Sequence, residues 1–220
     1  MVRKAGRPNE KTEAREQLIV SARELFVVLP YEKVSTRMIA QKASVNAAMI
    51  RYYFGNKEGL FETMIRETVE PVAQQIKRFS DSDNIGGLGE VMKAYYQTMG
   101  KIPQFPRLIA QIMNMSPSDT QRRLLEKIIR EISHPVDAMI SERLQKNGII
   151  HKDFDPQLCG FSFKSLMIFP FLAPPAMMKL QGIEINEDFL ERLFEHNMKL
   201  LSHGFFTSEQ NVHTGDNNEY

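Results

Sequence analysis

The stretch ASVNAAMIRYYFGNKEGLF, residues 43–61, places three adjacent aromatic residues between two alanines and a Gly-Asn step. Successive residues of an α-helix are turned by about 100°, so the three rings cannot all point into one core. We expect Phe54 to be the core ring, packed onto a preceding helix near Phe26. We expect Tyr53 to be intermediate and Tyr52 to face a binding partner. The stretch therefore predicts a short helix with an exposed aromatic side chain.

Two more helices are predicted just before this stretch. Apolar residues recur at helical spacing over residues 11–29, and Pro30 ends that run. Ser35 is placed to cap a second helix, and Asn46 is placed to cap a third that ends near Tyr53. The sequence thus predicts three helices, of which the second and third are short and joined by a tight turn.

Two short helices joined by a tight turn are typical of a helix-turn-helix, whose second helix enters the DNA major groove. Ala47 and Ala48 leave the front of that helix uncrowded, so its backbone can approach the bases. Hydroxyl and cationic side chains suited to phosphate or base contacts surround it: Thr36, Arg37, Arg51, Tyr52 and Lys57. Spacing alone does not establish DNA binding, because any helical protein contains short helix pairs.

The charge distribution favours a polyanionic partner at the N-terminal end. Residues 1–57 carry 11 Lys and Arg against 5 Glu, a net charge of +6, whereas the other 17 Lys and Arg and 22 Asp and Glu leave residues 58–220 at −5. Such an asymmetry is expected when only one end of a chain meets a polyanion. Within the basic N-terminal arm, Arg3, Lys4 and Arg7 are predicted to neutralise phosphates or enter the minor groove.

The rest of the sequence also predicts helices. Their expected ranges are 57–79, 88–101, 104–114, a helix opened by Ser116 and Pro117 that meets Pro135 and resumes to Lys146, an apolar helix from Pro156, and 186–202. Residues 158–178 are long enough to span a membrane. Three prolines, a central Lys164 and the lack of a second such segment favour a buried or interface helix, and no membrane partner is expected.

Residues 15–61, REQLIVSARELFVVLPYEKVSTRMIAQKASVNAAMIRYYFGNKEGLF, resemble the DNA-binding region of TetR-type transcriptional regulators. The resemblance lies in an apolar-Ala-x-x-Leu-Phe helix, a Ser/Thr-initiated helix with Ile-Ala, a short recognition helix and aromatic-Phe-x-x-Lys-x-x-Leu. It implies an all-α homodimer that binds double-stranded DNA at a palindromic operator, holds a small ligand in its C-terminal part and more commonly represses. Carried over by position, it assigns phosphate or base contact to Thr36, Arg37, Asn46, Ala47, Ala48, Met49, Arg51, Tyr52 and Lys57.

Three residues depart from the pattern of this family. Ser44 stands where the turn commonly has Gly, so either a positive φ there costs roughly 1 kcal/mol or the turn differs slightly. Arg51 replaces a common Tyr, and Pro30 replaces another frequent Gly. None of these changes removes the architecture, but Arg51 alters which base or phosphate can be contacted.

Enzymatic and metal-binding readings find little support in the sequence. The five histidines lack metal-ligand spacing, and Gly86-Gly87-Leu88-Gly89 has neither a preceding strand nor a following Lys for a phosphate loop. The single Cys159 fits a reducing cytoplasm, because it has no partner for an internal disulfide. We therefore expect a cytoplasmic protein that is not an enzyme and has no cofactor or bound metal.

The expected organisation is an N-terminal three-helix DNA-binding domain with its basic arm, 1–57, a larger helical ligand-binding and dimerisation domain, 58–206, and a disordered tail, 207–220. The dimer face is expected on the helices at 156–173 and 186–203, which are too apolar to be exposed. Residues predicted to border an apolar cavity for an apolar or amphipathic effector are Met64, Met92, Tyr95, Tyr96, Met99, Met113, Ile128 and Met167. A helical small-molecule carrier without operator binding remains the alternative.

Overall fold

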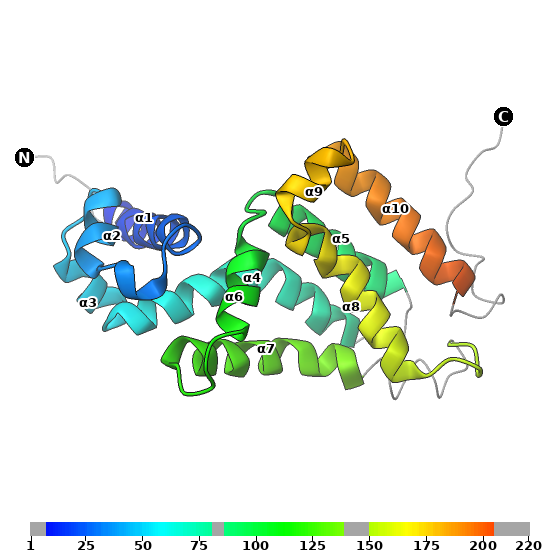
Figure 1. The fold of residues 1–220 in the computed structure, drawn as a ribbon. Coiled ribbons are helices and arrows are strands. Elements are labelled where there is room, and N and C mark those ends of the chain that lie inside the picture. Colours follow the sequence, from blue (N-terminus) through cyan, green and yellow to red (C-terminus); the bar gives the residue numbers. More distant parts are fainter. Residues whose placement is uncertain (1–7, 81–85, 139–149, 205–220) are drawn as a thin grey trace, which may run out of the picture. The chain divides into compact units, whose positions relative to one another are not determined.

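The computed structural model describes residues 8–80, 86–138 and 150–204, and within these ranges all regular elements are helical, which confirms the all-α prediction (Figure 1). The elements are α1 (Pro8–Phe26), the 3₁₀ turn η1 (Tyr31–Lys33), α2 (Thr36–Lys42), α3 (Ala48–Phe54), α4 (Lys57–Ser80), α5 (Gly86–Gly100), α6 (Phe105–Met113), α7 (Thr120–Ala138), α8 (Pro156–Leu172), α9 (Pro175–Leu180) and α10 (Glu187–Gly204). No helix in the described ranges has both the length and the apolar character needed to cross a membrane. The predicted disordered tail lies outside the described residues.

The chain divides into two compact units. The first comprises residues 1–70 and 107–128, and the second comprises 71–106 and 129–220, so that the boundaries fall inside α4, α6 and α7. Pro71 stands at the boundary in α4. Because proline has no amide hydrogen, the helix lacks the bond that residue 71 would donate to the carbonyl of Glu67. The predicted functional division at residue 57 stays a prediction.

Side chains of polar residues mark most helix starts at the predicted places. Ser35 Oγ accepts a bond from the Met38 amide at 3.1 Å, and Asn46 Oδ1 accepts one from the Ala48 amide at 2.9 Å. Asp155 caps α8 and Asn186 bonds the Phe189 amide ahead of α10. These oxygens satisfy amides that have no acceptor inside the helix, which is why short polar residues foretell the starts.

Three helix predictions need correction. Ser116 and Pro117 form a turn in which Ser116 Oγ accepts a bond from the Ser118 amide, so α7 begins only at Thr120. This helix then continues through Pro135 to Ala138 instead of breaking there, and its expected resumption to residue 146 lies outside the described residues. The apolar run at 158–178 is not one helix, because α8 ends at Leu172 and α9 begins at Pro175. The 3₁₀ turn η1 is not predicted by the sequence pattern.

The aromatic core of the first unit is built from Phe26, Tyr31 and Phe61. Their ring centroids lie 5.0–5.3 Å apart, with Phe26 stacked on Tyr31 and Phe61 edge-on to both. Phe61, which is 1% exposed, thus takes the place that was predicted for Phe54. Phe54 lies in the last turn of a short helix, is only half-buried and packs under the Arg15 guanidinium, 5.6 Å from its ring centre. The predictions that Tyr52 is exposed and Tyr53 intermediate are confirmed.

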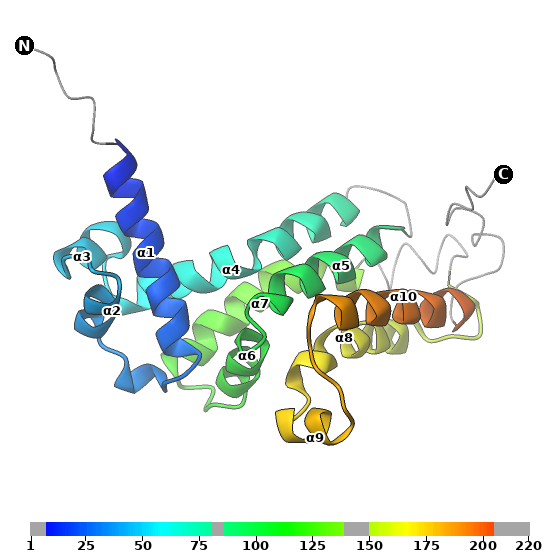
Figure 2. The same cartoon turned by 90° about the horizontal axis from the view of Figure 1, so that it is seen from above.

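In the second unit, α5 contacts both α8 and α10. Figure 2 shows α5 and α10 running side by side. Gly100 makes part of this approach possible, since a Cβ built there would lie only 2.8 Å from Leu190 Cδ1. A side chain at position 100 would therefore require the Leu190 side chain to shift.

A buried polar connection joins these three helices. The Tyr96 hydroxyl on α5 donates to the Leu166 carbonyl on α8 at 2.9 Å and accepts a bond from Asn197 Nδ2 on α10 at 2.9 Å. Leu166 is four residues before Pro170, which has no amide hydrogen to donate to it. The tyrosine therefore supplies the donor that the proline withholds, and burial raises the pKa of its hydroxyl to about 12, so it keeps its proton at neutral pH.

The substitution Tyr96→Phe should lower the free energy of unfolding by about 1–3 kcal/mol, because it leaves a buried carbonyl and a buried amide unpaired. Chemical denaturation measures the loss. Tyr95→Phe is the matched control, since Tyr95 packs on Phe171 through its ring and has no hydroxyl bond to another described residue.

A double-mutant cycle isolates the role of the proline. Pro170→Ala restores an amide that can bond the Leu166 carbonyl, so Tyr96→Phe should cost less in that background. An equal cost in both backgrounds would contradict this account of the Tyr96 bond.

Candidate nucleic-acid interface

The turn between α2 and α3 is tight and closely packed. Ile39 and Ala40 on α2 and Ile50 on α3 are buried, with at most 3% of each side chain exposed. The Val45 amide bonds the Ala40 carbonyl at 2.9 Å, and Ser44 has a φ of 55°. This confirms the strained conformation anticipated at Ser44, where glycine would relieve roughly 1 kcal/mol. The two helices are thereby held in a fixed crossing.

One side of α3 is exposed and bears the predicted contact residues. Asn46, Ala47, Ala48, Arg51 and Tyr52 are exposed, whereas Met49 is half-buried. Ala47 and Arg51, like Ala48 and Tyr52, are four residues apart and so lie on neighbouring turns of one face. Small residues in the first turn and longer polar ones in the next let the helix enter a groove N-terminus first.

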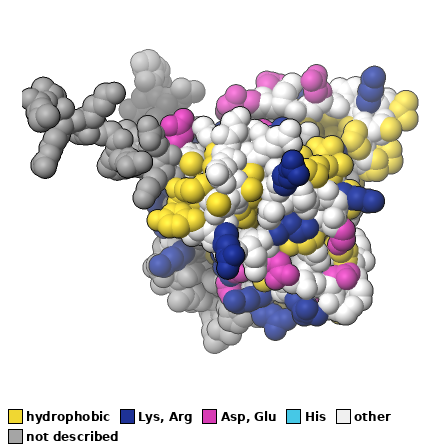
Figure 3. Space-filling model, turned by 90° about the vertical axis from the view of Figure 1, so that its left-hand side faces the viewer, with side chains coloured by type: hydrophobic (Ala, Val, Ile, Leu, Met, Phe, Trp, Pro, Cys, Tyr) yellow, Lys and Arg dark blue, Asp and Glu magenta, His cyan; other side chains and the backbone are white. Residues whose placement is uncertain are grey.

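Residues at the start of α2 adjoin this surface in sequence and carry further candidates. Arg37 is exposed and Thr36 is half-buried. Figure 3, which views the left-hand side of Figure 1, shows Lys and Arg side chains distributed among apolar and acidic ones on this face. The predicted phosphate contacts from Arg3, Lys4 and Arg7 lie outside the described residues.

Lys57 is differently placed from the other predicted contact residues. Its ammonium group donates to the carbonyls of Tyr31 and Val34, each at 2.9 Å, and lies 3.9 Å from the centre of the Tyr31 ring. Burial lowers the pKa of Lys57, while Glu32 and Glu58 oppose that shift. The side chain thus fixes the segment that leads into Ser35, the cap of α2. Its predicted phosphate contact stays a prediction.

The residues predicted to border the ligand cavity divide between the two units. Met64, Met113 and Ile128 belong to the first unit, and Met92, Tyr95, Tyr96, Met99 and Met167 belong to the second. Tyr95 and Met113 are half-buried and the others are buried. This assignment stays a prediction.

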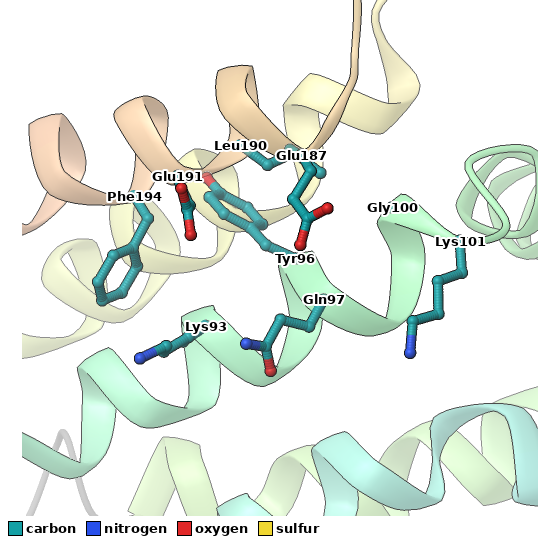
Figure 4. A pocket seen from close by; sticks show the side chains of 9 residues that line it. All are labelled: Lys93, Tyr96, Gln97, Gly100, Lys101, Glu187, Leu190, Glu191 and Phe194. Atoms are coloured by element: carbon teal, nitrogen blue, oxygen red, sulfur yellow. The ribbon is translucent and has the colours of Figure 1, made fainter.

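The second unit contains a pocket of about 490 Å³ between α5 and α10 (Figure 4). Of the predicted ligand residues, Tyr96 alone lines it. The other lining residues were not foreseen from the sequence: Lys93, Gln97, Gly100, Lys101, Glu187, Leu190, Glu191 and Phe194. Positions 93, 97 and 101 do show helical spacing, but periodicity does not tell which helix a given face will meet.

Comparison with known proteins agrees with the geometry of α2 and α3. Residues 18–64 match a family described as bacterial regulatory proteins, tetR family. This match confirms the resemblance to TetR-type transcriptional regulators that the sequence predicts. YttP of Bacillus subtilis strain 168, described as an HTH-type transcriptional regulator, is 22% identical over 214 residues, which cover 89% of this chain and 95% of YttP. These TetR-type relatives are DNA-binding regulators and not enzymes.

Solved structures share the fold over most of their length. A Clostridium perfringens protein described as a fatty acid metabolism regulator superposes with a TM-score of 0.69 at 18% identity, over 87% of this chain and 99% of that one. NalD of Pseudomonas aeruginosa is the secondary repressor of the MexAB-OprM multidrug efflux pump. It superposes with a TM-score of 0.66 at 17% identity, over 90% of this chain and 99% of NalD. SmeT in complex with triclosan superposes with a TM-score of 0.63 at 12% identity, over 94% of this chain and 98% of SmeT.

Replacing Lys57 by Met should lower the free energy of unfolding by about 1–2 kcal/mol, because it keeps the aliphatic stem and removes the donor to two carbonyls. Denaturant titration measures the change. Lys127→Met, at an exposed position on α7, is the control and should leave stability almost unchanged. Equal stability of the two variants would show that the Lys57 bonds contribute nothing.

Proposed function

We propose that this protein is a ligand-responsive repressor that binds a palindromic operator as a homodimer and is released by a small apolar or amphipathic effector. Action on operator DNA implies a cytoplasmic site of action in a bacterial cell. The observation that carries the DNA-binding part is the exposed face of α3, with small residues in its first turn and Arg51 and Tyr52 one turn later. The NalD repressor and the SmeT–triclosan complex support repression and an apolar effector by analogy.

The docking mode follows from that face. The backbone of α3 enters the major groove at Ala47 and Ala48, where no long side chain obstructs it. Arg51 and Tyr52 then reach base edges or phosphates, and Arg37 at the start of α2 reaches the phosphate backbone. The Lys57 bonds fix the segment before α2 and thereby help to position Arg37 for the proposed phosphate contact.

Arg37→Gln and Arg51→Gln should each weaken binding to an operator obtained by selection from random DNA. A lost phosphate contact lowers the slope of log affinity against log salt by about 0.9, whereas a lost base contact costs about 1–3 kcal/mol and relaxes sequence preference. Fluorescence anisotropy over a salt series at fixed temperature measures both quantities.

Lys127→Gln is the control for this experiment, since it removes the same charge from an exposed position on α7. It should leave affinity and salt slope close to those of the wild type. If neither arginine variant differed from this control, docking through α2 and α3 would be excluded.

The proposed dimer face lies on α8 and α10. An exposed stripe runs along α8 through Leu158, Phe161, Phe169 and Leu172, with exposed fractions of 37–70%. The opposite face of α8 is buried and also apolar, so this helix is hydrophobic all round. Leu200 on α10 is half exposed. Such a patch is expected to be covered, and a two-fold pairing of these helices would cover it symmetrically.

Phe161→Glu should convert the dimer to a monomer, because two-fold symmetry places the new charge in the interface twice. Sedimentation velocity at micromolar concentration measures the result. Val28→Glu is the matched control, because Val28 is 76% exposed and lies in the first unit. A dimer that persists in Phe161→Glu, or a wild type that is monomeric, would overturn the proposed face.

Helix α4 is the proposed link between effector and DNA. Within the first unit, Arg15 on α1 pairs with Glu67, and Arg23 Nε donates to Thr68 Oγ1 at 2.9 Å. These contacts tie α1 to α4 near the unit boundary, so a change in the tilt of α4 would carry α1 and the helices packed on it. By reciprocity, an effector that weakens operator binding is itself bound more weakly by the operator complex, by the same factor.

A further inference from the structure

The pocket between α5 and α10 differs in chemistry from the apolar cavity that the sequence predicts. Its inner surface is apolar, since Tyr96 and Leu190 are 3% and 6% exposed. Its rim is charged, with Glu187 and Glu191 on α10, Lys93 on α5 and Lys101 directly after α5. All four charged residues are exposed. An apolar base below a charged rim suits an amphipathic ligand.

The two carboxylates can act on one group, whereas the two lysines cannot. Glu187 and Glu191 are four residues apart on α10, so they are neighbours on one face. Figure 4 shows both of them, and Phe194, reaching from α10 toward α5. Lys93 lies on α5 and Lys101 directly follows its end, so the two are about 12 Å apart along the helix axis. Negative charge is therefore concentrated on the α10 wall of the pocket, whereas positive charge lies at the two ends of the opposite wall.

The carboxylates have no internal counterpart in the described part of the chain. Neither Glu187 nor Glu191 makes an ion pair or side-chain hydrogen bond with another described residue. Glu187 lies in the first turn of α10, where the helix dipole favours a carboxylate. Glu191 lies beyond that turn, and the dipole gives it no comparable stabilisation. A cation between the two carboxylates would be attracted by both.

The neighbouring side chains limit further which kinds of ligand the pocket can bind. Phe194 lies one turn beyond Glu191 in the wall of the pocket, and an aromatic ring attracts a cation as well as an apolar body. Gln97 stands between the lysines and offers an amide oxygen. Lys93 and Lys101 would repel a second positive charge at either end. The recognised molecule thus carries one positive charge and an apolar or aromatic body.

We propose that the α5–α10 pocket binds a singly charged amphipathic organic cation, with its charge between Glu187 and Glu191 and its apolar part against Phe194, Leu190 and Tyr96. This inference rests on the proposed function only in treating that cation as the effector. Binding itself needs neither DNA nor dimerisation. Because Tyr96 also holds the Leu166 carbonyl and Asn197, occupation of the pocket contacts the group that joins α5 to α8 and α10.

The test is an NMR titration of the full chain, without DNA, using three probes of similar size: benzyltrimethylammonium, benzyl alcohol and benzenesulfonate. The wild type should bind the cation more tightly than the neutral or anionic probe. Glu187→Gln and Glu191→Gln should each weaken cation binding about threefold to tenfold and leave benzyl alcohol binding unchanged, as expected for a partly solvated charge.

Glu195→Gln is the matched control, because Glu195 is exposed on the same helix and does not line the pocket. It should bind the cation as the wild type does. Thermal unfolding checks that all variants keep the fold. Three results would overturn the proposal: no preference of the wild type for the cation, equal cation binding by Glu191→Gln and Glu195→Gln, or a preference for benzenesulfonate that Lys93→Gln removes. None of these results would contradict the proposed operator binding, which is measured separately.

Discussion

The position of the DNA-binding face depends on the two hydrogen bonds of the Lys57 ammonium group. The carbonyls of Tyr31 and Val34 lie at the two ends of η1, and one cation bonds both while resting on the Tyr31 ring. Charge-assisted bonds to carbonyls are stronger than neutral ones, so this short irregular segment is held firmly. Ser35 follows directly and caps α2, which the tight turn at Ser44 joins to α3. A residue outside the predicted helix-turn-helix therefore fixes the segment that leads into α2.

The second unit applies the same principle with a neutral donor. Proline inside α8 leaves the Leu166 carbonyl without its helical partner, and Tyr96 supplies a hydroxyl in place of the missing amide. Since Asn197 bonds the same hydroxyl, the defect in one helix becomes the point at which three helices are joined. In both units, a side chain distant in sequence bonds backbone carbonyls where the secondary structure is irregular or interrupted by proline. Such bonds fix the packing more specifically than apolar contact alone.

Local signals in the sequence predicted most helix starts, because a capping residue and its amide partner are two or three positions apart. They failed where a turn uses the same chemistry, as at Ser116, whose bond to Ser118 imitates a cap. The choice between Phe54 and Phe61 depended on which turn of which helix faces α1, and the spacing of aromatic residues does not contain that information. The exposed face of α3 was predictable from its own sequence. The α5–α10 pocket was not, because its two walls are about ninety residues apart.

The missing hydrogen bond at Pro71 gives α4 a mechanical character beyond its role as a connection. A helix that lacks one backbone bond bends more readily at that place than elsewhere, so Pro71 is the position at which α4 is expected to bend most easily. Arg15 and Arg23 on α1 bond α4 immediately before this position, at Glu67 and Thr68. In the proposed coupling, bending at Pro71 would absorb part of any displacement of the later part of α4 before it reached α1. In the proposed mechanism, the stiffness of this single turn would limit how much of an effector's binding energy reaches the DNA-binding helices.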